Sequence, residues 1–228
     1  NLYPETVYEK LRNGDILDIG FKGLRLQVEK ISKNSIKLST MNPGILENNK
    51  GVHVVNRKIK LNYLTDKDFK AIKIAQKMKI KYFALSFTNS EKDIIKFNKL
   101  LPKEGKIYKI ETLSAVNYID KMFKFGNEFL IDRADLSKGI SIEKIPAIQK
   151  KILTKARKKG KNIYIATNFL ESMVQNFVPA VNEANDIYSS LDSGAQGLVL
   201  AAETAIGKYP KECVGFLKKQ IKFFIKNN

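Results

Sequence analysis

The sequence has 228 residues, a hydrophobic content of 43% and a formal net charge of +18 at pH 7. A chain of this length can bury a complete core, and no apolar run approaches the roughly 18 residues that a membrane-spanning helix needs. The single cysteine, Cys213, excludes an internal disulfide and suits a reducing compartment, so we expect a cytoplasmic protein. The positive charge comes mostly from dispersed lysines without any aromatic-basic motif, so we expect neither a nucleic-acid nor a membrane partner.

The first part of the chain has the pattern of a small β-rich domain. Short runs of alternating apolar and polar residues occur at residues 24–28, 35–38 and 52–55. Turn-forming stretches such as Asn13-Gly14 and Asn42-Pro43-Gly44 separate these runs. We therefore expect a β-rich domain over residues 1–62.

From Thr65 onward the pattern becomes α/β. Thr65 and Asp68 have the spacing of a helix capping box, with apolar residues at helical spacing after them. Short runs rich in Ile, Tyr and Phe then begin near residues 82, 107, 129, 163 and 197, and amphipathic helical stretches lie between them. This alternation predicts βα units of a parallel sheet over residues 63–228.

Charged and hydroxyl side chains stand where three of these predicted strands end. Lys109 and Glu111 follow the run at 107–108, Asp135 follows the run at 129–131, and Thr167 follows the run at 163–165. Because the carboxyl ends of parallel strands share one face, we expect these groups to converge. Lys109 and Glu111 lie two residues apart, so their side chains should point to the same side of the strand.

This set of groups suits phosphoryl transfer with a divalent cation. Glu111 and Asp135 would form a sparse carboxylate site for Mg²⁺, and Lys109 would offer a compact cation to a phosphoryl oxygen. The turn at 134–137 can open a short helix whose N–H groups would meet a substrate carboxylate. Each residue alone also has an ordinary structural interpretation, as a salt-bridged strand residue, a helix cap or a strand-end hydroxyl. Together and in this order, they favour a site.

Four stretches also carry a resemblance to a known family. They are KIE at 109–111, RADL at 133–136, ATNFLESM at 166–173 and AETAIGKYP at 202–210. They resemble KIEN, ARGDLG, ATQMLESM and SGETAKGxYP of the pyruvate kinases, in the same order and at close to the same spacing. The resemblance covers nearly the whole chain. It implies a partial (β/α)8 TIM barrel, with a lid-domain remnant over residues 1–62 and the C-terminal part of the barrel over residues 63–228.

The resemblance also implies an activity and roles for individual residues. The reaction would convert phosphoenolpyruvate and ADP to pyruvate and ATP in glycolysis, with Mg²⁺ or Mn²⁺ as the metal. Lys109 and Thr167 would be catalytic, Glu111 and Asp135 would bind the metal, and Ala134, Asp135 and Thr167 would bind substrate. Thr167 would lie beside the enolate carbon, with bound water as the proton carrier. K⁺ dependence and homo-oligomerisation are left open.

Two departures from the family limit these expectations. Ala134 stands where the family has glycine, and strands one to three of the family barrel are absent. Five strands cannot close such a barrel without an edge, so we expect a fragment that is incomplete for activity alone. The alternatives are a non-catalytic, truncated remnant and a Mg²⁺-dependent lyase or aldolase acting on a pyruvate-type enolate. Lys109 argues against the lyase, because an enolate alone needs no phosphoryl cation.

Overall fold

The structure is a computed structural model that describes residues 2–20, 23–33, 35–55, 57, 59 and 61–228. The chain forms two compact units that divide after Lys79. Among the described helices, none combines the length and the apolar composition needed to cross a membrane. The domain boundary predicted near residue 63 marks a change from a β-rich to an α/β sequence pattern, and it stays a prediction.

The first unit contains a four-stranded antiparallel sheet with the order β3-β2-β1-β4. Its strands are β1 (Ile16–Ile19), β2 (Leu24–Ser32), β3 (Ser35–Thr40) and β4 (Val52–Val54). A 3₁₀ helix, η1 (Glu5–Lys10), precedes the sheet, and helix α1 (Asp66–Lys77) follows it. The β-rich character predicted for residues 1–62 is therefore present in the described part of the first unit.

Alternation of apolar and polar residues explains how this sheet acquires a core. Leu24, Leu26 and Val28 are buried along β2, and Leu17 and Ile19 of β1 pack into the same cluster. One buried face and one exposed face is the usual arrangement of an antiparallel sheet. The helix that follows begins at the predicted capping box.

The box joins the first turn of α1 to the residue before it. The Thr65 N–H donates to Asp68 Oδ2 at 2.7 Å, and the Asp68 N–H donates to Thr65 Oγ1 at 3.3 Å. These two bonds satisfy N–H groups that a helix start otherwise leaves unpaired.

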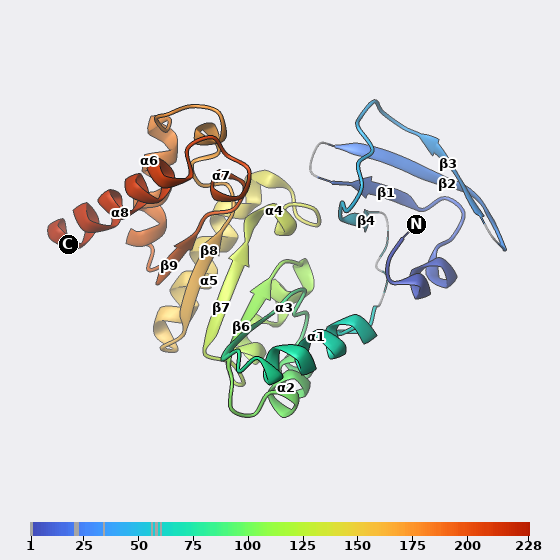
Figure 1. Ribbon diagram of the computed structural model, residues 1–228, viewed down its shortest axis with the longest axis horizontal. Coiled ribbons are helices and arrows are strands. Elements are labelled where there is room, and N and C mark those ends of the chain that lie inside the picture. The colour runs from blue at the N-terminus through green and yellow to red at the C-terminus, as the bar shows by residue number, and fades with distance from the viewer. Residues whose placement is uncertain (1, 21–22, 34, 56, 58, 60) are drawn as a thin grey trace. The chain divides into compact units, whose positions relative to one another are not determined.

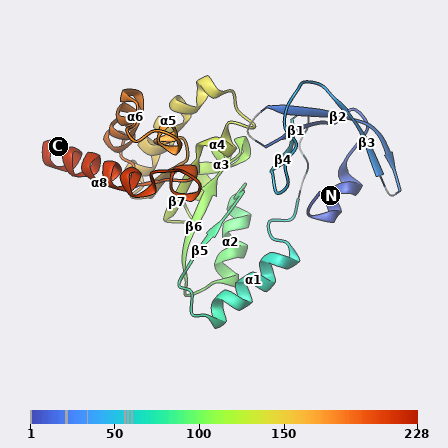
Figure 2. The same cartoon turned by 45° about the horizontal axis from the view of Figure 1, so that its top comes forward.

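The second unit is built on a five-stranded parallel sheet in the sequential order β5-β6-β7-β8-β9. Its strands are β5 (Tyr82–Leu85), β6 (Gly105–Ile110), β7 (Glu128–Asp132), β8 (Asn162–Ala166) and β9 (Gly197–Val199). Strands β6 to β9 lie side by side in Figure 1, and Figure 2 shows β5 beside β6. The predicted α/β class and the parallel sheet are confirmed.

Helices and short turns connect successive strands. The longer helices are α2 (Glu91–Leu100), α3 (Leu113–Met122), α5 (Ile145–Lys158), α6 (Val181–Asp192) and α8 (Pro210–Asn227). The shorter segments are α4 (Arg133–Leu136), η2 (Ile142–Lys144), η3 (Glu171–Val174) and α7 (Ala202–Ala205). Helices α6 and α8 lie side by side (Figure 2), with the rings of Tyr188 and Phe224 5.3 Å apart.

The two faces of this sheet differ in burial, and the register shows why. Ile110, Ile131 and Ile165 are neighbours across β6, β7 and β8, and each is 0% exposed. The preceding residues, Lys109 and Leu130, are also paired and point to the opposite face, where they are only half-buried.

Aromatic side chains pack the buried face against the helices. The ring of Tyr108 lies 6.4 Å from the ring of Phe97 in α2, and Phe123, which follows α3, lies 4.9 Å from Phe129 in β7. The half-buried face leads at its carboxyl end to the polar residues singled out from the sequence.

Candidate active site

All five residues predicted for the site stand at the carboxyl ends of three neighbouring strands. Lys109 belongs to β6, and Glu111 lies directly after it. Ala134 and Asp135 lie in α4, the short helix that follows β7, and Thr167 comes directly after β8. Because β6, β7 and β8 are adjacent and parallel, their ends bring these residues to one region of the sheet.

The ammonium group of Lys109 lies between two carboxylates. Its Nζ is 2.6 Å from Glu111 Oε1 and 3.1 Å from Asp132 Oδ2. Burial disfavours the charged ammonium, but these two carboxylates outweigh it and raise the pKa of Lys109 above its ordinary value. Lys109 is therefore a fixed positive charge at neutral pH.

Glu111 is held in place by the backbone of the preceding βα unit. Its side chain is 1% exposed, and its Oε2 accepts a hydrogen bond from the N–H of Phe87. Phe87 has a φ of 49°, an unusual conformation for a bulky residue and of the kind that recurs at functional sites. Oε1 is fully buried, and among the described residues it forms an ion pair with the ammonium of Lys109.

Three carboxylates approach closely enough to share one cation. One oxygen each from Glu111, Asp132 and Asp135 lies within 4.8 Å of the others. Hard divalent cations such as Mg²⁺ prefer carboxylate oxygens and keep positions for water and substrate oxygens. Glu111 and Asp132 are buried in this cluster, so the donor set present fits a divalent cation.

Burial also sets the protonation of these acids. It raises the pKa of Glu111, against the opposing effect of Lys109. Burial and the neighbouring Asp132 charge raise the pKa of Asp135 above its ordinary value of 3.8. Burial therefore disfavours the anionic form of both carboxylates, even with the Lys109 ammonium beside Glu111, and we call them strained anions. A divalent cation bound between them would offset this cost.

We expect Asp135→Asn to stabilise the metal-free protein at neutral pH. A carboxyl whose folded pKa is raised contributes stability that is present below its unfolded pKa and is lost as the pH rises through the folded pKa. At pH 7 the Asp135 charge therefore opposes folding, and the gain from asparagine should shrink toward pH 3.8. Thermal unfolding in a chelator at several pH values measures this.

Asp120 offers a control of opposite sign. The ammonium groups of Lys155 and Lys159 lower its pKa, so its stabilising contribution is present at neutral pH and is lost as the pH falls. Asp120→Asn should therefore give no gain at pH 7. A loss of stability in Asp135→Asn that is equal at all pH values would contradict the strained-anion interpretation.

Thr167 is tied into the same region through its hydroxyl group and its backbone. Its Oγ1 accepts a hydrogen bond from the Ala134 N–H at 3.0 Å and lies 3.3 Å from Asp132 Oδ1. Its φ of 69° is unusual for a β-branched residue, and the surrounding contacts must hold it there. Ala134 is helical, so the alanine in place of the family glycine causes no backbone strain.

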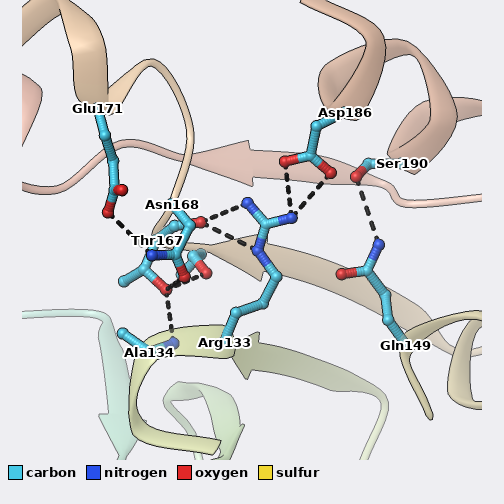
Figure 3. A network of polar contacts seen from close by, with 9 residues as sticks. Arg133, Ala134, Gln149, Thr167, Asn168, Glu171, Asp186 and Ser190 are labelled. Carbon is cyan, nitrogen blue, oxygen red and sulfur yellow. Dashed lines mark hydrogen bonds and ion pairs between the residues drawn. The ribbon is translucent and has the colours of Figure 1, made fainter. Parts of the chain in front are cut away.

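Arg133 fixes the backbone of Thr167, as Figure 3 shows. Its Nε and Nη2 donate to the Thr167 carbonyl oxygen at 3.1 and 2.6 Å, and its Nη1 donates to both carboxylate oxygens of Asp186 in α6. The guanidinium also lies 4.1 Å from the centre of the Phe169 ring. One buried cation therefore joins α4, the turn after β8, and α6.

We expect Arg133→Lys to lower the free energy of unfolding by about 2 kcal/mol, because one ammonium cannot bond Thr167 and Asp186 together. Urea denaturation measures the effect. Arg157→Lys is the matched control, since Arg157 is exposed and donates to the Asp192 carbonyl oxygen at 3.2 Å, and it should change stability by about 0.5 kcal/mol or less. Equal effects of the two substitutions would show that Arg133 does not link these elements.

Sequence reasoning missed three parts of this arrangement. The sequence alone predicts a helix cap at Asp132–Asp135 and gives Asp132 no place in the site, although the family pattern ARGDLG has alanine at its position, and that departure is a visible signal. Arg133 belongs to the RADL motif, but the sequence does not show which residues it contacts. The Phe87 N–H had no signal in the sequence, because a backbone group reveals its role only through the fold.

Two other glutamates of the motifs bond locally. Glu203 is buried and accepts a hydrogen bond from the Ala201 N–H at 2.7 Å, and Glu171 accepts one from Asn168 Nδ2 at 2.9 Å. Both contacts join residues two or three positions apart, so each glutamate stabilises its own turn.

Comparison with known proteins identifies the family. Residues 2–214 match the family model described as the barrel domain of pyruvate kinase. The chain is 36% identical to a pyruvate kinase of Buchnera aphidicola subsp. Schizaphis graminum, covering 94% of this chain and 47% of that protein. It is 32% identical to a pyruvate kinase of Thermotoga maritima, covering 93% of this chain and 46% of that protein. The chain spans about half the length of the curated relatives it matches, and it belongs to the pyruvate kinase family.

Proposed function

We propose that these residues form the Mg²⁺-dependent centre of a glycolytic phosphotransferase, which moves the phosphoryl group of phosphoenolpyruvate to ADP. The observation that carries this proposal is the position of Lys109 Nζ, 2.6 Å from the buried Glu111 carboxylate, at the edge of the carboxylate cluster. A fixed cation beside a divalent-cation site is the arrangement that phosphoryl transfer needs, since catalysis there is mostly positioning and charge stabilisation.

Each residue has a role that its surroundings support. Glu111 and Asp135 would hold Mg²⁺ or Mn²⁺, which supplies positive charge to the oxygens of the substrate when it is bound. Lys109 would stabilise negative charge on the phosphoryl oxygens during transfer. The hydroxyl of Thr167 would orient a water that delivers a proton to the enolate carbon, with Ala134 and Asp135 contributing to the substrate pocket.

The role of each unit in a larger protein follows from the same resemblance. The β-rich segment of residues 1–62 would correspond to the second half of the family's lid domain. The parallel sheet of the second unit would supply strands four to eight of the barrel, whose open edges the remaining strands would cover. A cytoplasmic enzyme using phosphoenolpyruvate, pyruvate, ADP and ATP is the corresponding proposal for the complete protein.

Binding of oxalate, a mimic of enolpyruvate, tests this proposal on the complete protein that contains the chain. We expect calorimetry to detect oxalate binding in the presence of Mg²⁺ or Mn²⁺ and none in excess chelator, because a cation held by Glu111 and Asp135 would supply the positive charge that attracts the oxalate dianion. Absence of metal-dependent oxalate binding would contradict the proposal and favour a non-catalytic remnant.

A further inference from the structure

A third acidic side chain enters the carboxylate cluster at a position where the family pattern has none. In the pattern ARGDLG the first residue is alanine, and here it is Asp132, the last residue of β7. Asp132 is 7% exposed, and one of its oxygens lies within 4.8 Å of oxygens of Glu111 and Asp135. The side chain is therefore part of the site and not a surface substitution.

The two oxygens of Asp132 have different partners. Oδ2 lies 3.1 Å from Lys109 Nζ, so it shares this ammonium with Glu111. Oδ1 accepts a hydrogen bond from the Asp135 N–H at 3.4 Å, which caps α4, and lies 3.3 Å from Thr167 Oγ1. Asp132 thus contacts a residue from each of the three strand ends that build the site.

The additional carboxylate changes the charge of the site once a divalent cation is present. Two carboxylates, one ammonium and one divalent cation leave a net positive charge that attracts an anionic substrate. With Asp132 ionised, the same group of charges is neutral. A like charge at this distance in a partly buried site strongly weakens binding of an anion, and it strengthens binding of a cation.

We propose that Asp132 sets the ligand preference of this site, binding the divalent cation more tightly and the anionic substrate more weakly than a two-carboxylate site would. This inference rests on the proposed function, because it concerns the same cation and the same anion. A second observation shows that this cluster binds positive charge: Glu111 Oε1 is fully buried, and the ammonium of Lys109 lies 2.6 Å from it.

The test compares Asp132→Asn with the unmodified complete protein, by titration with Mn²⁺ and then with oxalate at saturating Mn²⁺. Asparagine keeps an oxygen that can cap α4 and replaces the charged oxygen beside Lys109 with an uncharged amide group. We expect Mn²⁺ affinity to fall about 10- to 100-fold. Oxalate affinity should rise by about tenfold, because the repulsion between like charges is removed. Asp132→Ala, which restores the family residue, should change both affinities in the same directions.

Asp120→Asn is the matched control, because Asp120 is an ion-paired carboxylate outside the cluster, and it should alter neither affinity. Thermal unfolding in chelator verifies that each variant folds. If Asp132→Asn leaves both affinities unchanged while Glu111→Gln loses Mn²⁺, the inference is wrong and the proposed metal site stands. If none of the cluster variants alters Mn²⁺ binding, or the unmodified protein binds no Mn²⁺, both are wrong.

Discussion

Replacing Lys109 by methionine is expected to lower the proposed transfer of a phosphoryl group from phosphoenolpyruvate to ADP by about 10²–10³-fold, the usual cost of losing one preorganised electrostatic group. Methionine has a similar length and no charge, so the substitution removes the ammonium and keeps most of the volume. In the proposed role, Lys109 would stabilise the charge that builds on the transferring group, so the rate should fall far more than ligand affinity. Steady-state kinetics and Mn²⁺ titration of the complete protein measure the two effects separately.

Lys106 provides the matched control within the same strand. Its ammonium group donates to the backbone carbonyl oxygens of Leu101 and Glu104, at the other end of β6 from the carboxylates. Lys106→Met should leave the rate of transfer close to that of the unmodified protein. A Lys109→Met variant that also transfers phosphate at a near-normal rate would show that Lys109 is a structural strand lysine.

Replacing Glu111 by alanine is expected to weaken metal-dependent binding of oxalate by about 100-fold or more, since changes even in the groups around metal ligands cost about 10–100-fold in affinity. Two carboxylates form ion pairs with Lys109, and Glu111 is the more buried of them, with a side chain that is 1% exposed against 10% for Asp132. The Phe87 N–H fixes the direction of the Glu111 carboxylate. Asp135→Ala should have a comparable effect, because Asp135 would be the other proposed metal ligand. Calorimetric titration with oxalate, with and without Mn²⁺, measures both.

Glu128, at the start of β7, is the control for the loss of a carboxylate from the same sheet. Glu128→Ala should bind oxalate as the unmodified protein does when Mn²⁺ is present. Retained metal-dependent binding in both Glu111→Ala and Asp135→Ala would refute the assignment of these two residues to the metal.

The strands of the second unit could be predicted because local sequence carries their signal. Runs rich in Ile, Tyr and Phe were expected near residues 82, 107, 129, 163 and 197, and strands begin at Tyr82, Gly105, Glu128, Asn162 and Gly197. The capping box at Thr65 and Asp68 was also confirmed, because both of its hydrogen bonds join residues three apart. Signals of this kind need no knowledge of the rest of the fold.

Contacts between segments far apart in the sequence could not be predicted in the same way. The hydrogen bond from the Phe87 N–H to Glu111 joins residues 24 apart, and the pair of Arg133 and Asp186 joins residues 53 apart. Neither contact follows from propensity or spacing, since each depends on the register of neighbouring strands and on the docking of α6. The meeting of Lys109 with Asp132 likewise required the pairing of β6 with β7.

The convergence of the site residues could be predicted in outline, but the net charge of the site could not. The strand-end rule predicts that Lys109, Glu111 and Asp135 lie near one another. It does not reveal that the Asp132 side chain points toward Lys109 and adds a third carboxylate to the cluster. A substitution of alanine by aspartate inside a motif therefore deserves as much weight as the motif residues that match.

The reaction of the unmodified, complete protein with phosphoenolpyruvate and ADP in deuterated water, followed by NMR, distinguishes a kinase from an enolate lyase in one measurement. The proposed function predicts that phosphorus moves from phosphoenolpyruvate to ATP, that deuterium enters the methyl group of pyruvate, and that both changes require Mg²⁺ or Mn²⁺. The positioned ammonium of Lys109 is the reason to expect the transfer. A parallel sample holds added pyruvate besides phosphoenolpyruvate and ADP. Metal-dependent entry of deuterium into the methyl group of this pyruvate, without any formation of ATP in either sample, would contradict the kinase proposal and support an enolate lyase.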